Sequence, residues 1–524
     1  MPAGEREDDM LQVNHLTLTH KKDLRTLVHD LSFVCNDGDK VAVIGEEGNG
    51  KSTLLQWMYD SERVESYCQC AGSVNGAQGA GYLAQQLSEE EKALSVYEFC
   101  MRSENFLELS YRELTEIARH LSLPVDEYYS DRQVATLSGG ERIKLQLSRL
   151  LFDGPRVLLL DEPSSDLDLP TLRWLEDFIK SFRGIVIYIS HDEMLMEHTA
   201  TAILHIEHPR ESKPPRCTFA RLDYRTYAEC RMMGIEDQER RARKEREEYE
   251  DKMERYRRIQ QSVEHAQNAV SRQDPSTGRL LKKKMHAVTS MGRRFEREAE
   301  NMTKLPEIEE AVFLRFSPEI TLPAGKTVLD LRLDQLWAGE KLLANDVRLR
   351  VSGGEKIGIM GQNGAGKTTF IRIIAKELCA RKDLCAAYMP QDYSELLPPE
   401  ESALEFLAPS GCYDDVKRAS IFLGSIRFKR EEMFHPMKEL SGGQRAKIFL
   451  TQMMLNNANV LILDEPTRNF SPLSQPRIRS VLQGYTGSII SVSHDRKYLY
   501  DVCDKVYRLT DDGLLPVEKE TLLR

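Results

Sequence analysis

The 524-residue chain has no apolar run long enough for a transmembrane helix, which needs about 20 consecutive apolar residues. Its first residues, Met-Pro-Ala-Gly-Glu-Arg-Glu-Asp-Asp, are polar and lack the apolar core of a signal peptide. Ten cysteines are scattered, and the closest pair, Cys68 and Cys70, has no partner pair at zinc-finger spacing. We therefore expect a cytoplasmic protein with reduced thiols and no membrane partner.

The chain also lacks an excess of basic residues. It has 72 Lys and Arg against 83 Asp and Glu, a formal net charge of -11. This charge argues against a general nucleic-acid binder, so we expect no DNA partner, and any RNA contact has to come from a local basic patch. Hydrophobic residues make up 41% of the chain, which is enough to build cores in several domains.

A long internal repeat organises the sequence. GEEGNGKST at 45–53 recurs as GQNGAGKTT at 361–369, LSGGE at 137–141 as LSGGQ at 440–444, VLLLDEP at 157–163 as VLILDEP at 460–466, and ISHD at 189–192 as VSHD at 492–495. The last three motifs recur at one offset of 303 residues, whereas Lys51 and Lys367 are 316 apart. The first copy is therefore 13 residues longer after its first motif. We expect a longer hairpin or loop around 61–80.

Each copy contains a phosphate-binding loop. An apolar strand, 41–44 or 357–360, runs into Gly-x-x-x-x-Gly-Lys-Ser/Thr and then into a helix, the context that such a loop requires. Its backbone N–H groups and the helix N-terminus attract phosphates, the lysine reaches the β- and γ-phosphates, and the hydroxyl binds Mg²⁺. The predicted ATP-binding residues are Gly45, Gly48, Asn49, Gly50, Lys51, Ser52 and Thr53, and Gly361, Asn363, Gly364, Gly366, Lys367, Thr368 and Thr369.

An acidic pair ends an apolar strand in each copy. Asp161 and Asp464 are placed to hold Mg²⁺ beside the phosphate loop, together with the hydroxyls of Ser52 and Thr368. The adjacent carboxylates, Glu162 and Glu465, are placed to orient or deprotonate the attacking water. A pair of surface acids is the alternative, but the buried-type strands argue against it.

Two further residue types recur at matched positions. His191 and His494 follow apolar strands and are interpreted as sensors of the γ-phosphate, although a lone histidine is more often structural. Gln85 and Gln391 are predicted to reach the metal and the attacking water.

The Leu-Ser-Gly-Gly motifs precede predicted helices at 141–152 and 444–455. Serine and glycines at a helix N-terminus form a second anion site. A single copy does not need this site for its own nucleotide, but two copies facing head to tail do, because each motif then caps the nucleotide of the other. The predicted residues are Ser138, Gly139, Gly140, Ser441, Gly442 and Gly443.

In this order, the motifs resemble the ATP-binding cassette (ABC) superfamily over roughly residues 10–208 and 326–520. The resemblance implies an α/β fold with two P-loop cassettes and an ATPase that uses ATP and Mg²⁺ in two composite sites. Site one would join the first phosphate loop to Ser441 and Gly443, and site two the second loop to Ser138 and Gly140. The family stacks an aromatic residue on adenine. Trp337 takes that place in the second copy, and His20 departs from the pattern in the first.

The loop after the acidic pair also departs from the family pattern. In the first copy it ends in Asp168, whereas Ser471 stands at that position in the second copy. Because this loop faces the opposite cassette in the family, we expect the two sites to differ in hydrolysis rate or coupling. Both retain the glutamate, so we expect both to hydrolyse ATP.

Residues 223–305 separate the copies, giving predicted domains at 1–222, 223–305 and 306–524. Apolar residues recur at Ala242, Tyr249, Tyr256, Val263 and Val270 on a first helix, with Met253 and Ala266 between some of them. They recur at Leu281, Met285, Val288, Gly292, Phe295, Ala299 and Met302 on a second. This heptad pattern and the breakers at 273–278 predict an antiparallel coiled-coil hairpin.

The predicted far end of this hairpin is basic. From 265 to 295 the only acid is Asp274, and the bases are Arg272, Arg279, Lys282, Lys283, Lys284, Arg293 and Arg294. Such a patch predicts salt-dependent binding to RNA phosphates, without stacking on bases because aromatics are not interleaved. An exposed basic helix with no partner is the alternative.

Two fused cassettes without membrane spans, zinc-finger cysteines or an iron–sulfur domain are similar to the ABC-F group, which acts on the ribosome. The resemblance implies a monomer with paired cassettes that binds near the tRNA exit site and reaches P-site tRNA, rRNA and the peptidyl-transferase centre. Gln and LSGG are 53 and 50 residues apart in the two copies, so no arm is inserted, as in the antibiotic-resistance (ribosome-protection) branch. A housekeeping translation factor for stalled ribosomes, a transporter ATPase subunit and a protein-interaction strut remain alternatives.

Overall fold

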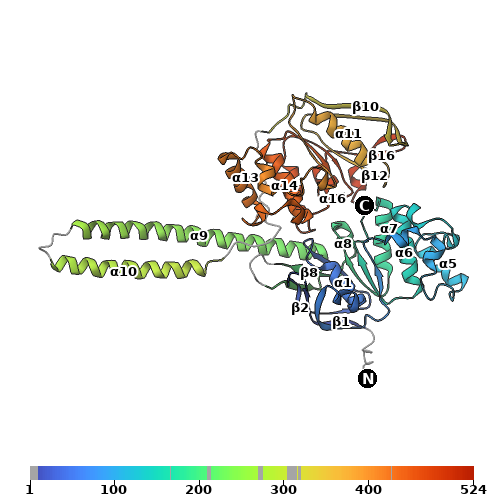
Figure 1. The fold of residues 1–524 in the computed structure, drawn as a ribbon, viewed down its shortest axis with the longest axis horizontal. Coiled ribbons are helices and arrows are strands. Elements are labelled where there is room, and N and C mark those ends of the chain that lie inside the picture. Colours follow the sequence, from blue (N-terminus) through green and yellow to red (C-terminus); the bar gives the residue numbers. More distant parts are fainter. Residues whose placement is uncertain are drawn as a thin grey trace, which may run out of the picture. The chain divides into compact units, whose positions relative to one another are not determined.

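The computed structural model describes residues 10–165, 167–208, 214–269, 275–303, 316, 320–426 and 428–523 (Figure 1). The chain divides into two compact units. One contains both cassettes, up to Arg225 and from Glu309 onward, and the other is Thr226–Ile308. The structure confirms the α/β class and the two sheet-containing cassettes.

Each cassette is built on a six-stranded sheet with the same strand order. The first sheet runs β5 (Gly81–Leu83), β6 (Val157–Asp161), β7 (Ile185–Ile189), β3 (Lys40–Gly45), β8 (Ala202–Glu207) and β9 (Arg216–Ala220). The second runs β13 (Ala386–Met389), β14 (Val460–Asp464), β15 (Ser488–Val492), β12 (Lys356–Gly361), β16 (Lys505–Thr510) and β17 (Gly513–Val517). Neighbours are parallel except β8–β9 and β16–β17. The central strands are continuous apolar runs because both of their faces are buried.

Helices surround each sheet. Those of the first cassette are α1 (Lys51–Tyr59), α2 (Ser61–Glu65), α3 (Glu89–Ala93), α4 (Val96–Cys100), α5 (Tyr111–His120), α6 (Gly139–Phe152), α7 (Leu169–Ser181) and α8 (Glu193–Thr199). Those of the second are α11 (Lys367–Cys379), α12 (Ala403–Leu407), α13 (Tyr413–Ser425), α14 (Gly442–Leu455), α15 (Gln475–Gln483) and α16 (Arg496–Val502). In the first cassette, α4, α5 and α6 share a core of their own around Phe99, Leu114 and Phe152, which makes a helical subdomain.

A smaller antiparallel sheet precedes each phosphate loop, and here the copies differ. In the first, β1 (Met10–His20) pairs with β2 (Thr26–Asn36) and with β4 (Cys68–Asn75). In the described part of the second, β10 (Thr327–Ala338) pairs only with β11 (Lys341–Ser352). The prediction of a longer hairpin or loop around 61–80 is therefore wrong, because this segment contains α2 and the edge strand β4, which pairs with β1. Cys68, Cys70 and Val74 alternate toward the core, with the period of a strand.

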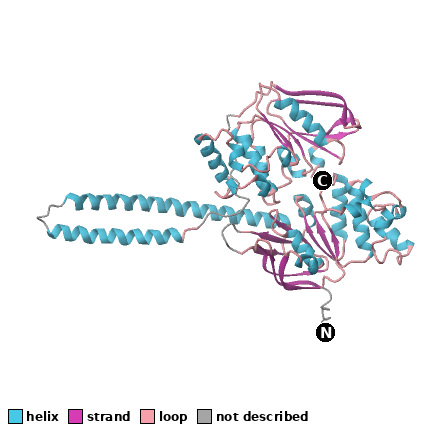
Figure 2. Cartoon of the chain, viewed as in Figure 1, coloured by secondary structure: helices cyan, strands magenta, loops and turns pink. Residues whose placement is uncertain are grey.

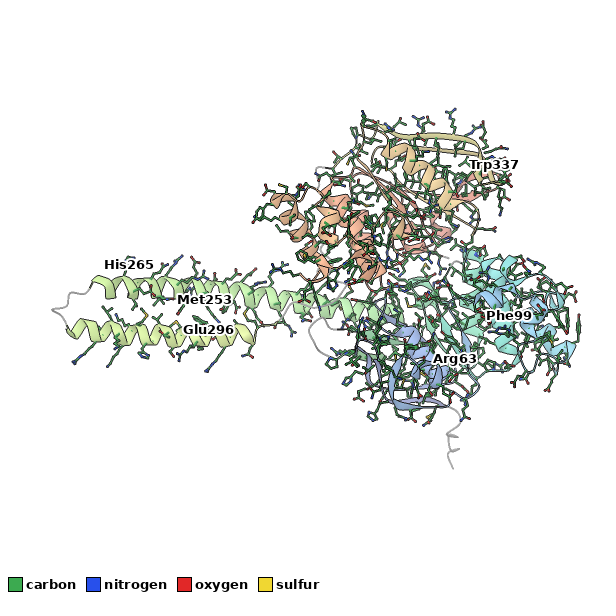
Figure 3. The ribbon with its side chains drawn as sticks, viewed as in Figure 1. Arg63, Phe99, Met253, His265, Glu296 and Trp337 are labelled. Atoms are coloured by element: carbon green, nitrogen blue, oxygen red, sulfur yellow. The ribbon has the colours of Figure 1, made fainter. Side chains whose placement is uncertain are left out.

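The hairpin unit consists of α9 (Tyr224–Ala269) and α10 (Pro275–Glu300), which lie side by side (Figure 2). The rings of Tyr256 and Phe295 pack at 5.9 Å with an interplanar angle of 88°. Lys252 Nζ lies 3.2 Å from Glu298 Oε2. As positions rise along α9, their partners fall along α10, so the helices are antiparallel. In Figure 3, the labelled Met253 of α9 and Glu296 of α10 lie at the same level of the two helices, as this antiparallel pairing requires.

The heptad positions face the partner helix with one exception. Buried or half-buried positions are Ala242, Tyr249, Met253, Tyr256, Val263 and Ala266 on α9, and Leu281, Met285, Val288, Gly292 and Phe295 on α10, followed by Met302 just after it. Ala299 is exposed, contrary to the pattern, because at this level the Lys252–Glu298 ion pair replaces an apolar contact. Val270 lies outside the described residues.

Part of the predicted turn at 273–278 is helical. Pro275 opens α10, so 275–278 are helical. Proline fits the first turn of a helix because the N–H that it lacks would have no partner there. Gln273 and Asp274 lie outside the described residues.

All ten cysteines are unpaired thiols. Among the helices in the described ranges, none has both the length and the apolar character required to cross a bilayer.

A buried cluster of ion pairs joins the two cassettes. Arg479 donates from both terminal nitrogens to Glu193, at 2.8 and 3.0 Å, and Lys497 Nζ donates to the same carboxylate at 3.0 Å. Arg496 Nη2 donates to Glu176 Oε1 at 2.5 Å. In these pairs the first cassette supplies both carboxylates and the second cassette supplies the three cations. Burial raises the pKa of Glu193, and Arg479 opposes that rise.

We predict that Arg479→Ala lowers the free energy of unfolding by about 3 kcal/mol, because it leaves the Glu193 carboxylate buried with only Lys497 as a cation. The measurement is the midpoint of urea unfolding. Replacing both partners, as in Arg479→Met with Glu193→Leu, should recover part of the loss, because the buried Arg479–Glu193 pair is removed as a whole and Lys497 keeps its contact with Glu197. A single variant as stable as the double variant would contradict this prediction.

Candidate functional site

A cavity of about 1400 Å³ lies between the cassettes, and both phosphate loops line it. In each cassette the loop follows β3 or β12, and the other candidate residues follow strands that neighbour it in the sheet. Because the carboxyl ends of parallel strands meet at one edge, residues far apart in sequence converge there.

The structure brings most of the predicted residues to this cavity. From the first cassette these are His20, Gly48, Gly50, Lys51, Ser52, Thr53, Gln85, Gly139, Asp161, Glu162 and His191. From the second they are Asn363, Gly364, Gly366, Lys367, Thr368, Thr369, Gln391, Asp464, Glu465 and His494.

Other predicted residues do not line it. They are Gly45, Asn49, Ser138, Gly140, Trp337, Gly361, Ser441, Gly442 and Gly443. Asn49 is buried and its amide donates to the Ile206 carbonyl at 3.1 Å, so it supports the loop from behind. Trp337, labelled in Figure 3, is 47% exposed and its indole N–H donates to Gln335.

Sequence reasoning missed one aromatic residue of the cavity. Tyr67 lines it beside His20, with ring centroids 6.3 Å apart. Its hydroxyl donates to Gln56 of α1 at 2.9 Å. Tyr67 lies in the segment that only the first copy has, just before β4, so comparison of the two copies offered no matched position.

The two phosphate loops have the same geometry. Lys51 Nζ donates to the carbonyls of Gly45 and Glu46 at 2.9 and 2.8 Å, and Lys367 repeats both bonds at the same distances. Gly50 precedes α1 with a φ of 83°, and an added Cβ would lie 2.8 Å from Leu27 Cβ. Only glycine fits there, which keeps the helix N-terminus open toward the cavity.

The predicted metal ligands are close together. Ser52 Oγ donates to Asp161 Oδ1 at 3.0 Å, and Tyr82 donates to the other carboxylate oxygen at 3.3 Å. Burial raises the pKa of Asp161, and it raises that of Asp464 to about 6. A hydroxyl and a carboxylate beside a phosphate loop are hard oxygen donors of the kind that Mg²⁺ prefers.

Both candidate catalytic glutamates have an unusual backbone. Glu162 and Glu465 each adopt a φ of 53°, the left-handed region that non-glycine residues rarely occupy. Their N–H groups donate to the carbonyls of Ile189 and Val492, the last residues of neighbouring strands, at 3.1 and 2.9 Å. Strain held in this way is typical of functional positions. No sequence signal revealed it.

Each glutamate faces the histidine of its own cassette. Glu162 Oε1 lies 3.3 Å from His191 Nε2, and Glu465 Oε1 lies 3.7 Å from His494 Nε2. In the second cassette, burial raises the pKa of Glu465 to about 8. Burial, followed by the charge of Lys367, lowers the pKa of His494 to about 4. At neutral pH both side chains of this pair are therefore uncharged.

His191 also contacts the second cassette. Its Nδ1 donates to the Phe470 carbonyl at 3.2 Å, and Gln475 donates to its backbone carbonyl at 3.0 Å. Phe470 belongs to the loop 466–471 that departs from the family pattern. That loop therefore reaches across the cassette interface to a candidate γ-phosphate sensor.

The Leu-Ser-Gly-Gly motifs open α6 and α14. Ser138 and Ser441 cap these helices in capping boxes with Glu141 and Gln444, so the helices start two residues before the predicted position. The Gly442 N–H donates to Glu47 Oε2 in the first phosphate loop at 2.9 Å. Site one thus contains a direct contact between a phosphate loop and the opposite motif.

The predicted RNA-binding side chains are outside this cavity, on α10. Arg279, Lys282, Lys283, Lys284, Arg293 and Arg294 are all exposed. Arg294 lies 3.3 Å from Glu298 and over the Phe295 ring, so part of its charge is used within the hairpin. Arg272 lies outside the described residues. The sequence analysis did not single out Leu280, an exposed apolar residue that lies among these basic residues.

Comparison with known proteins identifies the cassettes. The profile of the ABC transporter family matches residues 28–165 and 344–468, about half of the chain. The chain belongs to the ABC transporter family. This confirms the predicted nucleotide-binding ATPase with two tandem cassettes.

The relatives of the chain are ABC-F proteins, as the motifs predicted. The tylosin resistance ATP-binding protein TlrC of Streptomyces fradiae is 28% identical, over 92% of this chain and 94% of its own. The ribosome protection protein VmlR of Bacillus subtilis (strain 168) is 26% identical, over 94% and 85%. The ATP-binding protein Uup of Escherichia coli (strain K12) is 28% identical, over 90% and 76%.

Solved structures show the same fold. A complex of archaeal ribosomal stalk protein aP1 with archaeal ribosome recycling factor aABCE1 matches with a TM-score of 0.56 and 17% identity, over 99% of this chain and 92% of that chain. An RNase-L inhibitor matches with a TM-score of 0.54 and 17% identity, over 98% and 90%.

Separate Glu162→Gln and Glu465→Gln substitutions should each lower steady-state ATP turnover, and the double substitution should lower it by about 100-fold or more, because each removes a carboxyl group placed to orient or deprotonate the attacking water. Phosphate release by the full-length protein is the measurement. Wild-type turnover in either single variant would show that the opposite site carries hydrolysis alone.

The pKa of Glu465 also predicts a pH-dependent stability. Between about pH 4.5 and pH 8 the folded protein holds a proton that the unfolded chain has lost, so the free energy of unfolding falls as pH rises. Glutamine cannot lose this proton. The stability advantage of Glu465→Gln should therefore grow by about 1.4 kcal/mol for each pH unit in this window, and vanish below it.

Urea unfolding of both proteins at several pH values from 4.5 to 8 checks this expectation. A constant difference between them across the window would show that Glu465 is not buried as a neutral acid.

Proposed function

We propose that this chain is a ribosome-bound ATPase whose hairpin acts on P-site tRNA and the peptidyl-transferase centre, and that it protects the ribosome from antibiotics. The observation that carries this proposal is the hairpin. It is a separate unit whose basic side chains are exposed near one end, in a chain of net charge -11.

The geometry of the hairpin suits a probe of RNA. The 26 residues of α10 correspond to about 39 Å of helix, and α9 is longer. Lys282, Lys283 and Lys284 occupy consecutive exposed positions, so they present charge around the helix rather than toward α9. Such a surface fits the phosphates of folded RNA, and its binding should weaken as salt rises.

The cassettes supply the switch in this proposal. In the ATP-closed state of this proposal, site one joins Lys51, Ser52, Asp161, Glu162 and His191 to Ser441 and Gly443, and site two joins their counterparts to Ser138 and Gly140. The contacts of Glu47 with Gly442 and of His191 with Phe470 already cross the interface. When bound, Mg²⁺ neutralises the phosphates, and ATP closes the cassettes. Because the hairpin is joined covalently to both, closure and hydrolysis move it in a cycle.

The relatives support a ribosomal role. Two of them are named for ribosome protection and for tylosin resistance. Relatives named only as ATP-binding proteins are similar at comparable identity, so a housekeeping role on stalled ribosomes is the second candidate. A transporter subunit is less well supported, because the matches extend over 90% or more of the chain, including the hairpin.

The Glu162→Gln/Glu465→Gln protein, held with ATP, should cosediment with ribosomes on a sucrose gradient. Changing Lys282, Lys283 and Lys284 to Glu in that background should lower ribosome binding at physiological salt by at least about tenfold, because phosphate contacts become repulsive. The same change in the wild-type background should leave ribosome-independent ATP hydrolysis unaltered.

The matched control changes Arg241, Arg243 and Lys244 to Glu. These exposed bases lie on the same hairpin, about 39 Å along α9 from its far end, and their replacement alters the net charge equally. Equal loss of binding in both variants would show a general charge effect. Absence of the ATP-held protein from the ribosome peak would exclude the ribosomal role. Growth of a susceptible host under ribosome-targeting drugs then separates protection from housekeeping.

A further inference from the structure

The first phosphate loop contains a carboxylate that binds the opposite cassette. Glu47 Oε2 accepts a hydrogen bond of 2.9 Å from the Gly442 N–H. Gly442 is the first residue of α14, directly after its N-cap Ser441. The free N–H groups at such a position attract anions.

The end of the Glu47 side chain lies close to the backbone of Gly442, so a larger residue at Gly442 would displace it. An added Cβ would lie 2.7 Å from Glu47 Oε2 and 3.3 Å from Asn469. The carboxylate is therefore seated directly against the backbone of the motif, beside the divergent loop of the second cassette.

The second phosphate loop lacks this carboxylate. Aligning Gly45 with Gly361 and Lys51 with Lys367 places Asn363 opposite Glu47. Asn363 lines the same cavity but has a neutral side chain. The two sites therefore differ by one negative charge at equivalent positions of their loops.

An independent observation indicates that the same site suits a polar ligand. Glu162 lines the cavity with a side chain that is 9% exposed, and its buried Oε1 makes no hydrogen bond, its contact being His191 Nε2 at 3.3 Å. Such an oxygen is costly unless a ligand or water binds it. The cavity next to the Glu47–Gly442 bond is thus built for a polar occupant.

We propose that Glu47 is a specificity-determining residue of site one, because its carboxylate occupies the place at the N-terminus of α14 that the terminal phosphate of a nucleoside triphosphate takes. ATP has to displace Glu47 to close site one. ADP lacks the third phosphate and leaves the Glu47–Gly442 bond intact. This inference rests on the composite site of the proposed function, but not on the ribosome.

The consequence is an unequal pair of sites. At site one, part of the binding free energy of ATP is spent on breaking a charge-assisted hydrogen bond, whereas the corresponding residue of site two carries no charge. Because Glu47 is exposed, solvent screens this bond, and its effect lies at the lower end of the range for such bonds. Site one should therefore discriminate ATP from ADP less strongly than it would without Glu47.

The test uses the full-length chain with Lys367→Ala, which disables the second loop, and titrates it with mant-ATP and mant-ADP in Mg²⁺. Adding Glu47→Gln should lower the Kd for mant-ATP by about threefold to tenfold and leave the Kd for mant-ADP within about twofold. The matched control is Glu46→Gln. It removes the same charge one residue earlier, without the bond to Gly442, and should change the ATP-to-ADP ratio less.

A second measurement follows the bond itself. Hydrogen exchange of a peptide covering 440–446, without nucleotide, should be faster in Glu47→Ala than in the parent, because the Gly442 N–H then loses its acceptor. An equal gain in affinity for ATP and ADP, an equal effect of Glu46→Gln, or unchanged exchange would each overturn the proposal. Cosedimentation with ribosomes is a separate measurement, so failure of one conclusion does not imply failure of the other.

Discussion

The site between the cassettes depends on charge complementarity at their interface. Arg479 and Arg496 of the second cassette are almost fully buried against Glu193 and Glu176 of the first. A buried cation without a carboxylate partner is unfavourable, so each cassette fits this surface only when the other is present. The two copies also differ at this surface, because the first carries the acids of these pairs and the second carries the bases, although their sheets have the same strand order. Without this contact, neither Leu-Ser-Gly-Gly motif has a phosphate loop to face.

The two cassettes that share this interface differ at several candidate functional positions. The first has an added edge strand, β4, next to Tyr67 in the cavity, and a carboxylate, Glu47, on the opposite motif. The second has Ser471 in place of an aspartate, and a glutamate whose pKa burial raises to about 8. Each difference changes charge or contact in one cassette only.

The hairpin is held together by different forces from the cassettes. Its seam is a narrow apolar stripe, and exposed ion pairs such as Lys252–Glu298 link the two helices beside it. Narrow seams of this kind bury little surface, so much of the hairpin remains solvated and free to carry charge. The exposed basic residues of α10 occupy positions that do not belong to the apolar seam. A stable stem and a binding surface therefore coexist on the same two helices.

The sequence by itself determined the family, the strands that lead into each motif, and the antiparallel hairpin, because these depend on local spacing and periodicity. It was wrong about the segment 61–80 and about Ala299, where pairing with distant residues decided the outcome. Only the tertiary structure placed Glu47 against Gly442, 395 positions away. It also decided the left-handed backbone of Glu162 and Glu465 and the burial that raises the pKa of Glu465. These properties follow from which atoms surround a residue and exclude water from it, and that surrounding is set by packing rather than by sequence neighbours.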